Sequence, residues 1–120
     1  MRTDRLQQTL LDLNGTSADI EASALISTDG LMMASARPQG TDEDRSGAMT
    51  AALLSLGERA AMELARGKLQ RILIHGERGY VIMSASGTEA VLTLLAKQDA
   101  KLGLIFLDMK RTAESLAKLI

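Results

Sequence analysis

Two kinds of hydrophobic spacing alternate along this 120-residue chain, and their order is the feature that most constrains its fold. Segments with apolar residues at every second position, typical of strands, are interspersed with segments that repeat at helical spacing. Short turns join the strand-like segments, except where the long helix-forming segment 42–66 intervenes. Because short turns join antiparallel neighbours, this order predicts an antiparallel sheet in an α+β domain.

The first part of the chain predicts a helix followed by a hairpin. Residues 2–14 are expected to form a helix that Thr3 caps. Its apolar stripe consists of Leu6, Leu10 and Leu13. Segment 19–27 alternates apolar and polar residues and predicts a strand, and turn residues at 28–30 lead into a return strand at 31–37.

The long segment 42–66 is rich in Ala, Leu, Met, Glu and Arg, which favour helix, with Thr41 or Asp42 as its cap and Gly67 as its end. The remaining elements are expected to be strands at 69–75, 80–86 and 89–97 and a last helix at 100–119. The strand at 89–97 is apolar on both sides, so both faces of the sheet should be covered. We therefore expect one domain, 1–120, with the order α-β-β-α-β-β-β-α, a five-stranded antiparallel sheet and helices on both faces.

Composition excludes several classes of function. A net charge of −1 gives no field that would attract nucleic acid, and two aromatic residues supply almost no stacking surface for bases. No apolar run is long enough for membrane insertion. The absence of cysteine favours a cytoplasmic protein, although it is also compatible with export. With so few aromatic side chains, Met33, Met83 and Met109 are expected to fill the core.

The order of elements, together with the segments ALISTDGLMMASA, LQRILIHGERGYVIMSAS and EAVLTLLAKQDAKLGLIFLDMKRTAESLAKL, resembles the roadblock/dynein light chain family. That family is similar in architecture to profilin and longin domains. The resemblance implies homodimers or heterodimers in which the long helices pack together and the third strands join into one sheet. It also implies adaptor or regulatory roles, commonly with Ras-like small GTPases in bacteria and archaea.

The long helix carries more apolar surface than one sheet face can bury. One stripe, expected to cover the sheet, is Met49, Leu53, Leu56, Ala60 and Leu64. A second stripe of mostly small residues, which would let another helix approach closely, is expected at a dimer interface together with the edge strand. The expected interface residues are Gly47, Ala51, Leu54, Glu58, Ala61, Ala65, Leu69, Arg71 and Leu73. The alternative is a helix buried on two sides within its own domain.

A protein partner is expected on the exposed arc of the same helix. The residues expected to bind it are Ser55, Arg59, Met62 and Arg66. Arg37, Arg45 and Arg59 are nominal candidates for an arginine finger in trans. The resemblance singles out none of them, so any stimulation of a GTPase should come from repositioning its own switch residues.

No residue pattern indicates catalysis, a cofactor or a metal. His75 is the only histidine and is expected to have a structural or surface role, because no nucleophile and acid accompany it in a triad pattern. Asp42, Asp44 and Ser46 match the start of a calcium loop. Leu53, however, stands where that loop needs a bidentate glutamate.

The sequence thus favours a non-enzymatic dimeric regulator or adaptor of a Ras-like small GTPase, acting by GTPase activation or by binding one nucleotide state. A structural scaffold, such as a motor light chain or an assembly subunit, is the alternative. An enzyme or small-molecule sensor is disfavoured because histidines, cysteines and paired carboxylates do not cluster.

Overall fold

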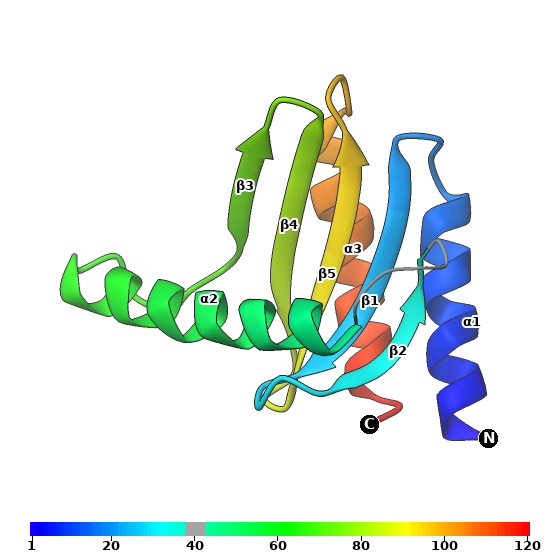
Figure 1. Cartoon of the computed structure of the whole chain (residues 1–120), viewed down its shortest axis with the longest axis horizontal. Coiled ribbons are helices and arrows are strands. Elements are labelled where there is room, and N and C mark those ends of the chain that lie inside the picture. The colour runs from blue at the N-terminus through cyan, green and yellow to red at the C-terminus, as the bar shows by residue number, and fades with distance from the viewer. Residues whose placement is uncertain (38–42) are drawn as a thin grey trace.

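The structure is a computed structural model that describes residues 1–37 and 43–120. Its elements follow the predicted order (Figure 1). They are α1 (Arg2–Gly15), β1 (Ile20–Ser27), β2 (Met32–Ala36), α2 (Glu43–Glu63), β3 (Ile72–Gly76), β4 (Gly79–Ser86), β5 (Ala90–Lys97) and α3 (Leu102–Ala117). The predicted caps Thr41 and Asp42 of the long helix lie outside the described residues.

The strands form one five-stranded sheet in the order β2-β1-β5-β4-β3. Every neighbouring pair is antiparallel, and β5 lies at the centre between β1 and β4. The predicted antiparallel sheet is therefore confirmed. The two edges are β2 and β3, and β3 borders the side of the sheet toward which α2 runs (Figure 1).

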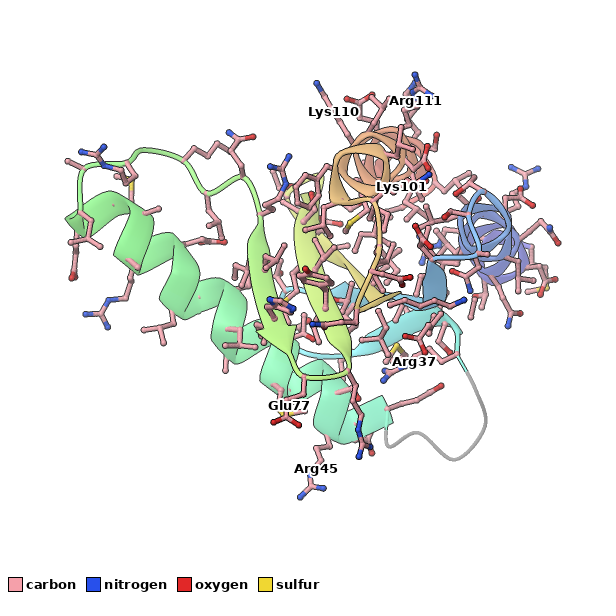
Figure 2. The ribbon with its side chains drawn as sticks, turned by 90° about the horizontal axis from the view of Figure 1, so that it is seen from above. Arg37, Arg45, Glu77, Lys101, Lys110 and Arg111 are labelled. Atoms are coloured by element: carbon pink, nitrogen blue, oxygen red, sulfur yellow. The ribbon has the colours of Figure 1, made fainter. Side chains whose placement is uncertain are left out.

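Helices cover both faces of the sheet, as predicted from the apolar character of β5. Helices α1 and α3 lie on one face and α2 lies on the other (Figures 1 and 2). Side chains of β5 are buried on both sides, with Leu92 in the core under α1 and α3 and Val91 in the core under α2. The sheet is thus the middle layer of three.

The core beneath α1 and α3 is the larger of the two. Its most deeply buried large side chains include Leu10, Leu13, Leu25, Ile82, Leu92, Leu94, Ile105, Met109 and Leu116. Polar side chains fix the same layer: the Ser86 hydroxyl donates to the Ala113 carbonyl at 2.7 Å, and the Asn14 amide donates to the Ala36 carbonyl at 3.0 Å. These bonds hold α3 and α1 in register with the strands.

The core beneath α2 is small. Its buried members are Leu54, Met83 and Val91, and partly buried Leu53, Leu69, Ile72 and Val81 pack around them. Burial of one such side chain contributes about 1.5–3 kcal/mol, so α2 is held by much less apolar burial than α1 and α3 are. The predicted core roles of Met83 and Met109 are confirmed, and Met33 packs partly buried against the larger core.

Two local predictions are wrong. Thr3 does not cap the first helix, because the helix already begins at Arg2, with Met1 at the cap position. The third strand begins at Ile72 and not at Leu69. The chain leaves α2 beyond the edge of the sheet, so the residues before Ile72 are used to bring it back to β4 (Figure 1).

Helix α2 ends before Gly67, the predicted end. Ala65 adopts φ 57°, its amide donates to the Met62 carbonyl at 3.1 Å, and the Arg66 amide donates to the Ala61 carbonyl at 2.7 Å. These two bonds make a Schellman motif, in which the residue after the cap takes the left-handed conformation that glycine adopts most easily. The motif therefore places an alanine at a position that favours glycine.

Replacing Ala65 with glycine should stabilise the protein. The left-handed conformation costs a residue with a Cβ about 1 kcal/mol, so we expect Ala65→Gly to raise the free energy of unfolding by about that amount in a urea titration. Ala60→Gly, inside the same helix, is the matched control and should lower it by about 1 kcal/mol. A loss of stability in Ala65→Gly would contradict the proposed strain.

Candidate interaction surface on the long helix and the β3 edge

Helix α2 packs on the sheet from its start to Gly57. Its buried residues are Gly47, Thr50 and Leu54, and Gly57 lies against Ile72 at the start of β3. The rest of the helix continues past β3 and projects beyond the edge of the sheet (Figure 1). The C-terminal end of the helix therefore lies outside the area that its own sheet supports.

Glycines bring α2 close to the rest of the fold at two points. A Cβ on Gly47 would lie 2.3 Å from the carbonyl oxygen of Gly30, in the β1–β2 turn. A Cβ on Gly57 would lie 2.8 Å from the Cδ1 atom of Ile72 at the start of β3. Because only glycine fits at the first contact without a backbone shift, the stripe containing Gly47, Thr50, Leu54 and Gly57 must face the sheet.

The predicted orientation of the two stripes of this helix is wrong. The larger side chains expected to cover the sheet are largely exposed: Met49 is 54% exposed, Leu56 63% and Leu64 70%. Leu53 alone among the large side chains of that stripe packs against the small core. Small residues face the sheet because the helix backbone lies close to the β1–β2 turn, and the larger side chains lie on the flank.

The residues predicted for a dimer interface do not form one exposed surface. Gly47 and Leu54 are buried against the chain's own sheet, so their assignment to an interface is corrected. Among the other helix residues, Ala51 and Ala61 are half-buried, and Glu58 and Ala65 are exposed.

The strand residues of that predicted interface separate onto the two faces of the sheet. Leu69 packs against the core under α2, whereas the Arg71 guanidinium lies over the Phe106 ring of α3, 4.3 Å from its centroid. Leu73 is 39% exposed within β3. Leu69 and Arg71 precede the strand, so of these three only Leu73 belongs to the edge.

The β3 edge is the second exposed part of the surface. This strand pairs with β4 on one side, and four of its five residues are exposed. Ile74, also 39% exposed, lies on the α2 face of the sheet and was not among the predicted site residues. The alternation in LQRILIH places it on the face opposite Leu73, and that signal could have identified it.

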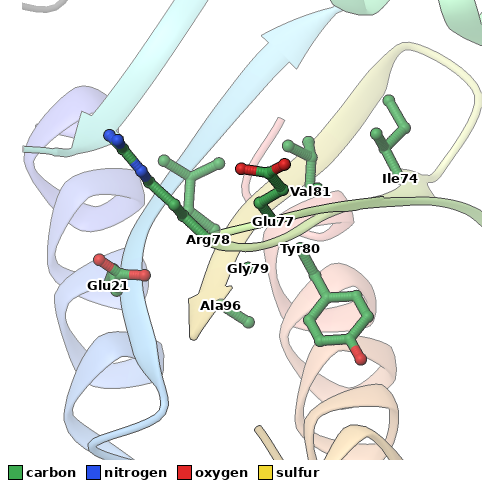
Figure 3. A pocket seen from close by; sticks show the side chains of 10 residues that line it. Glu21, Ile74, Glu77, Arg78, Gly79, Tyr80, Val81 and Ala96 are labelled. Atoms are coloured by element: carbon green, nitrogen blue, oxygen red, sulfur yellow. The ribbon is translucent and has the colours of Figure 1, made fainter. Parts of the chain in front are cut away.

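A hollow lies on the α2 face where that helix leaves the sheet uncovered. It has a volume of about 610 Å³ beside the β3–β4 turn, and its apolar lining includes Ile74, Val81 and Leu95. Ile74 and Val81 point to this side of the sheet, whereas Tyr80 points to the other (Figure 3). The hollow, the β3 edge and the flank of α2 with Leu56 and Leu64 together form the candidate surface.

The predicted partner-binding residues are exposed on α2 and just beyond its end. Ser55 and Arg59 are exposed on the helix, Met62 is 69% exposed on the flank opposite Leu56, and Arg66 is exposed after the helix has ended. The Arg59 guanidinium is 3.4 Å from the Glu63 carboxylate, an exposed pair one helical turn apart. The Nε of Arg66 donates to the Leu64 carbonyl. These contacts orient both arginines along the helix surface.

The other candidates are dispersed. Arg37 is half-buried after β2, and Arg45 is exposed in the first turn of α2 (Figure 2). His75 is exposed, stacks on Tyr80 with ring centroids 4.2 Å apart, and lies 3.0 Å from the Gln98 side chain. This is the expected surface role.

Among residues 1–37 and 43–120, no three His, Cys, Asp or Glu side chains gather as a metal site would require. No helix in the described ranges is long and apolar enough to cross a membrane.

The fold and this surface can be compared with known proteins. The model of the Roadblock/LC7 domain family matches residues 6–96. The uncharacterized protein MJ1340 of Methanocaldococcus jannaschii is 38% identical over 111 residues, which cover 92% of this chain and 96% of that protein.

Solved structures agree with the family match. A structure of MglB in a tetrameric arrangement has a TM-score of 0.89 at 24% identity, covering 98% of this chain and 89% of that one. A Roadblock/LC7 domain from Streptomyces avermitilis has a TM-score of 0.87 at 19% identity, covering 93% and 94%. The resemblance noted in the sequence is confirmed, and the chain belongs to the Roadblock/LC7 family.

Proposed function

We propose that residues 1–120 act as one domain in a cytoplasmic homodimer, a non-enzymatic regulator or adaptor that binds a Ras-like small GTPase. The observation that carries the proposal is the incomplete α2 face: an overhanging helix with an exposed apolar flank, an unpaired β3 edge and an open hollow beside it. Exposed strand edges and apolar patches of this kind mark interaction sites in native proteins.

A second copy, related by a two-fold axis, would complete all three features at once. If the two β3 strands pair antiparallel near Leu73 and Ile74, the rotation carries the partner's α2 to the opposite end of β3. Its projecting end would then lie over the hollow lined by Ile74, Val81 and Leu95. Such a self-complementary interface is the most common arrangement in soluble oligomers.

In this arrangement the apolar flanks of the two α2 helices face each other. The flank consists of Met49, Leu53, Leu56, Ala60 and Leu64, which replaces the small-residue stripe as the proposed helix–helix contact. Leu53, like Ile72 and Val81, packs partly buried against the cluster of Leu54, Met83 and Val91, so the flank is continuous with the chain's own small core. The dimer would thereby extend one apolar core across two chains.

Leu56→Asp should convert the dimer to a monomer. A charge buried without a partner costs about 3 kcal/mol, and the two-fold interface would bury one from each copy, so the dissociation constant should rise on the order of 10,000-fold. Light scattering at micromolar concentration should therefore report half the wild-type mass. Because Leu56 is 63% exposed in the single chain, its own fold should persist in circular dichroism.

Met62→Asp is the matched control for that variant. Met62 is as exposed as Leu56 but lies on the opposite flank of α2, so this variant should stay dimeric. Leu54→Asp, at a buried position, should unfold the chain instead of separating the two copies. A monomeric wild-type protein, or equal effects of Leu56→Asp and Met62→Asp, would contradict the proposed dimer.

A GTPase would bind the outer side of the paired helices. Paired α2 helices would present a broad surface on which Ser55 and Arg59 are exposed, with Arg66 exposed just beyond the helix end, and polar side chains of this kind suit the rim of an interface. The choice of partner follows from what membership in the family implies. A regulator must bind one nucleotide state more tightly than the other, because equal affinity shifts no equilibrium.

The test is a titration of the dimer against the small GTPase that occurs in the same cell, loaded with GDP or with a non-hydrolysable GTP analogue. We expect the two affinities to differ about tenfold or more, the smaller end of ordinary coupling energies. Arg59→Ala should weaken binding to the preferred state about fivefold, whereas Lys97→Ala on β5 should leave it unchanged.

Equal affinity for both states would favour the alternative function, a scaffold without a nucleotide-linked role. Absence of binding to any small GTPase of the cell would favour it too. The dimer proposal would survive either result, because it depends on the α2 flank and the β3 edge and not on the identity of the partner.

A further inference from the structure

A groove on the opposite face of the sheet has no part in the proposed dimer or GTPase surface. It lies between α3 and residues 68–71, the strap that returns the chain from α2 to β3, and has a volume of about 810 Å³. Lys68, Arg71, Lys110 and Lys118 line it, against the single acidic side chain Glu114 among its described lining residues. We call it the basic groove. Its local excess of positive charge contrasts with the net charge of −1 of the whole chain.

One cation of the basic groove is held in place. The Arg71 guanidinium lies over the Phe106 ring, with its Cζ 4.3 Å from the centroid, a cation–π contact that restrains the side chain. A planar guanidinium held in this way suits bidentate binding of a carboxylate. Within the described part of the chain, none of the four cations takes part in an ion pair of 4 Å or less.

The wall of the groove also contains an open strand edge. Pairing of β3 with β4 ends at Ile72 and Met83, whereas pairing of β4 with β5 continues to Ser86 and Ala90. Backbone groups alternate between the two neighbours of an antiparallel strand, so those of Ala85 point away from β5. Ala85 is exposed and lines the groove, so its amide and carbonyl are available to an added strand.

We propose that the basic groove binds an acidic, extended peptide segment of a partner protein. Its carboxylates would contact Arg71 and Lys110, and its backbone would pair with Ala85, the mode by which an extended peptide adds to a strand edge. Apolar side chains of the peptide would rest on Ala113 and Ala117. The open backbone favours a peptide over nucleic acid, and the ring face of Phe106 is already covered by Arg71 and offers no base a stacking surface.

The groove and the α2 surface lie on different faces of the sheet. Figure 2 shows α3 above the strands and α2 below them, with Lys110 and Arg111 leaving α3 in different directions. A dimer paired through α2 and β3 would therefore keep one groove open on each copy. This proposal goes beyond the GTPase function and stands without it, because the peptide is bound by residues that the α2 surface does not include.

The test uses a fluorescein-labelled peptide, Glu-Leu-Glu-Leu-Glu-Leu-Glu, titrated with the full chain and followed by fluorescence anisotropy. We expect saturable binding that weakens with added salt, and much weaker binding of the peptide with Gln in place of Glu. Lys110→Glu should weaken binding on the order of tenfold. Arg111→Glu, the neighbouring residue of α3 outside the groove, should change it by no more than about twofold.

The backbone contact has its own test. N-methylation of the central peptide amide removes one hydrogen-bond donor and should weaken binding about fivefold. The proposal is overturned if no binding occurs, if the Gln peptide binds equally well, or if Lys110→Glu and Arg111→Glu have equal effects. It is also overturned if oligothymidylate, or vesicles of phosphatidylserine and phosphatidylcholine, bind more tightly and displace the peptide. The GTPase titration is independent, so each proposal can fail alone.

Discussion

The contact between Gly47 and Gly30 sets the position of α2 and, through it, most of the surface of this protein. A Cβ added at Gly47 would lie only 2.3 Å from the carbonyl oxygen of Gly30, so the start of the helix packs directly against the β1–β2 turn. From that fixed point a helix of 21 residues, at about 1.5 Å per residue, runs across the sheet and past its edge. The C-terminal end of α2 therefore projects beyond the sheet. Because the chain leaves the helix there, residues 68–71 are needed to return it to the sheet, and β3 is correspondingly short.

The two faces of the sheet are consequently unequal. Under α1 and α3 a large core with buried hydrogen bonds such as Ser86 to Ala113 makes a stable base. Under α2 the buried cluster of Leu54, Met83 and Val91 is small, and apolar side chains remain uncovered on the flank of the helix and in the hollow near Ile74. If a second copy covers the apolar side chains on the α2 face, the unequal burial on the two faces of the sheet in a single chain is explained.

Sequence periodicity predicted the element order, the antiparallel sheet and the helices on both faces, because each of these depends on the spacing of apolar residues within short segments of the sequence. It failed on the orientation of α2, since an apolar stripe looks the same whether it meets its own sheet or another chain. Gly47 and Gly57 held the missing information: a close backbone approach needs glycine, so their stripe had to face the sheet. The basic groove could not be predicted from the sequence, because Arg71 and Lys110 line the same groove only once the strap and α3 have packed together.

The strap at 68–71 lies between two cavities. It is needed because α2 ends beyond the sheet. On the α3 face it borders the basic groove, and on the α2 face it borders a smaller cavity of about 380 Å³ that Met62 also lines. Both cavities share Leu69, Arg71 and Ala85 in their linings. Ligands in the two cavities would therefore contact the same short segment. The α2 flank, the β3 edge and the hollow near Ile74 lie outside both linings, so the strap links the two cavities to each other and leaves the proposed dimer surface separate.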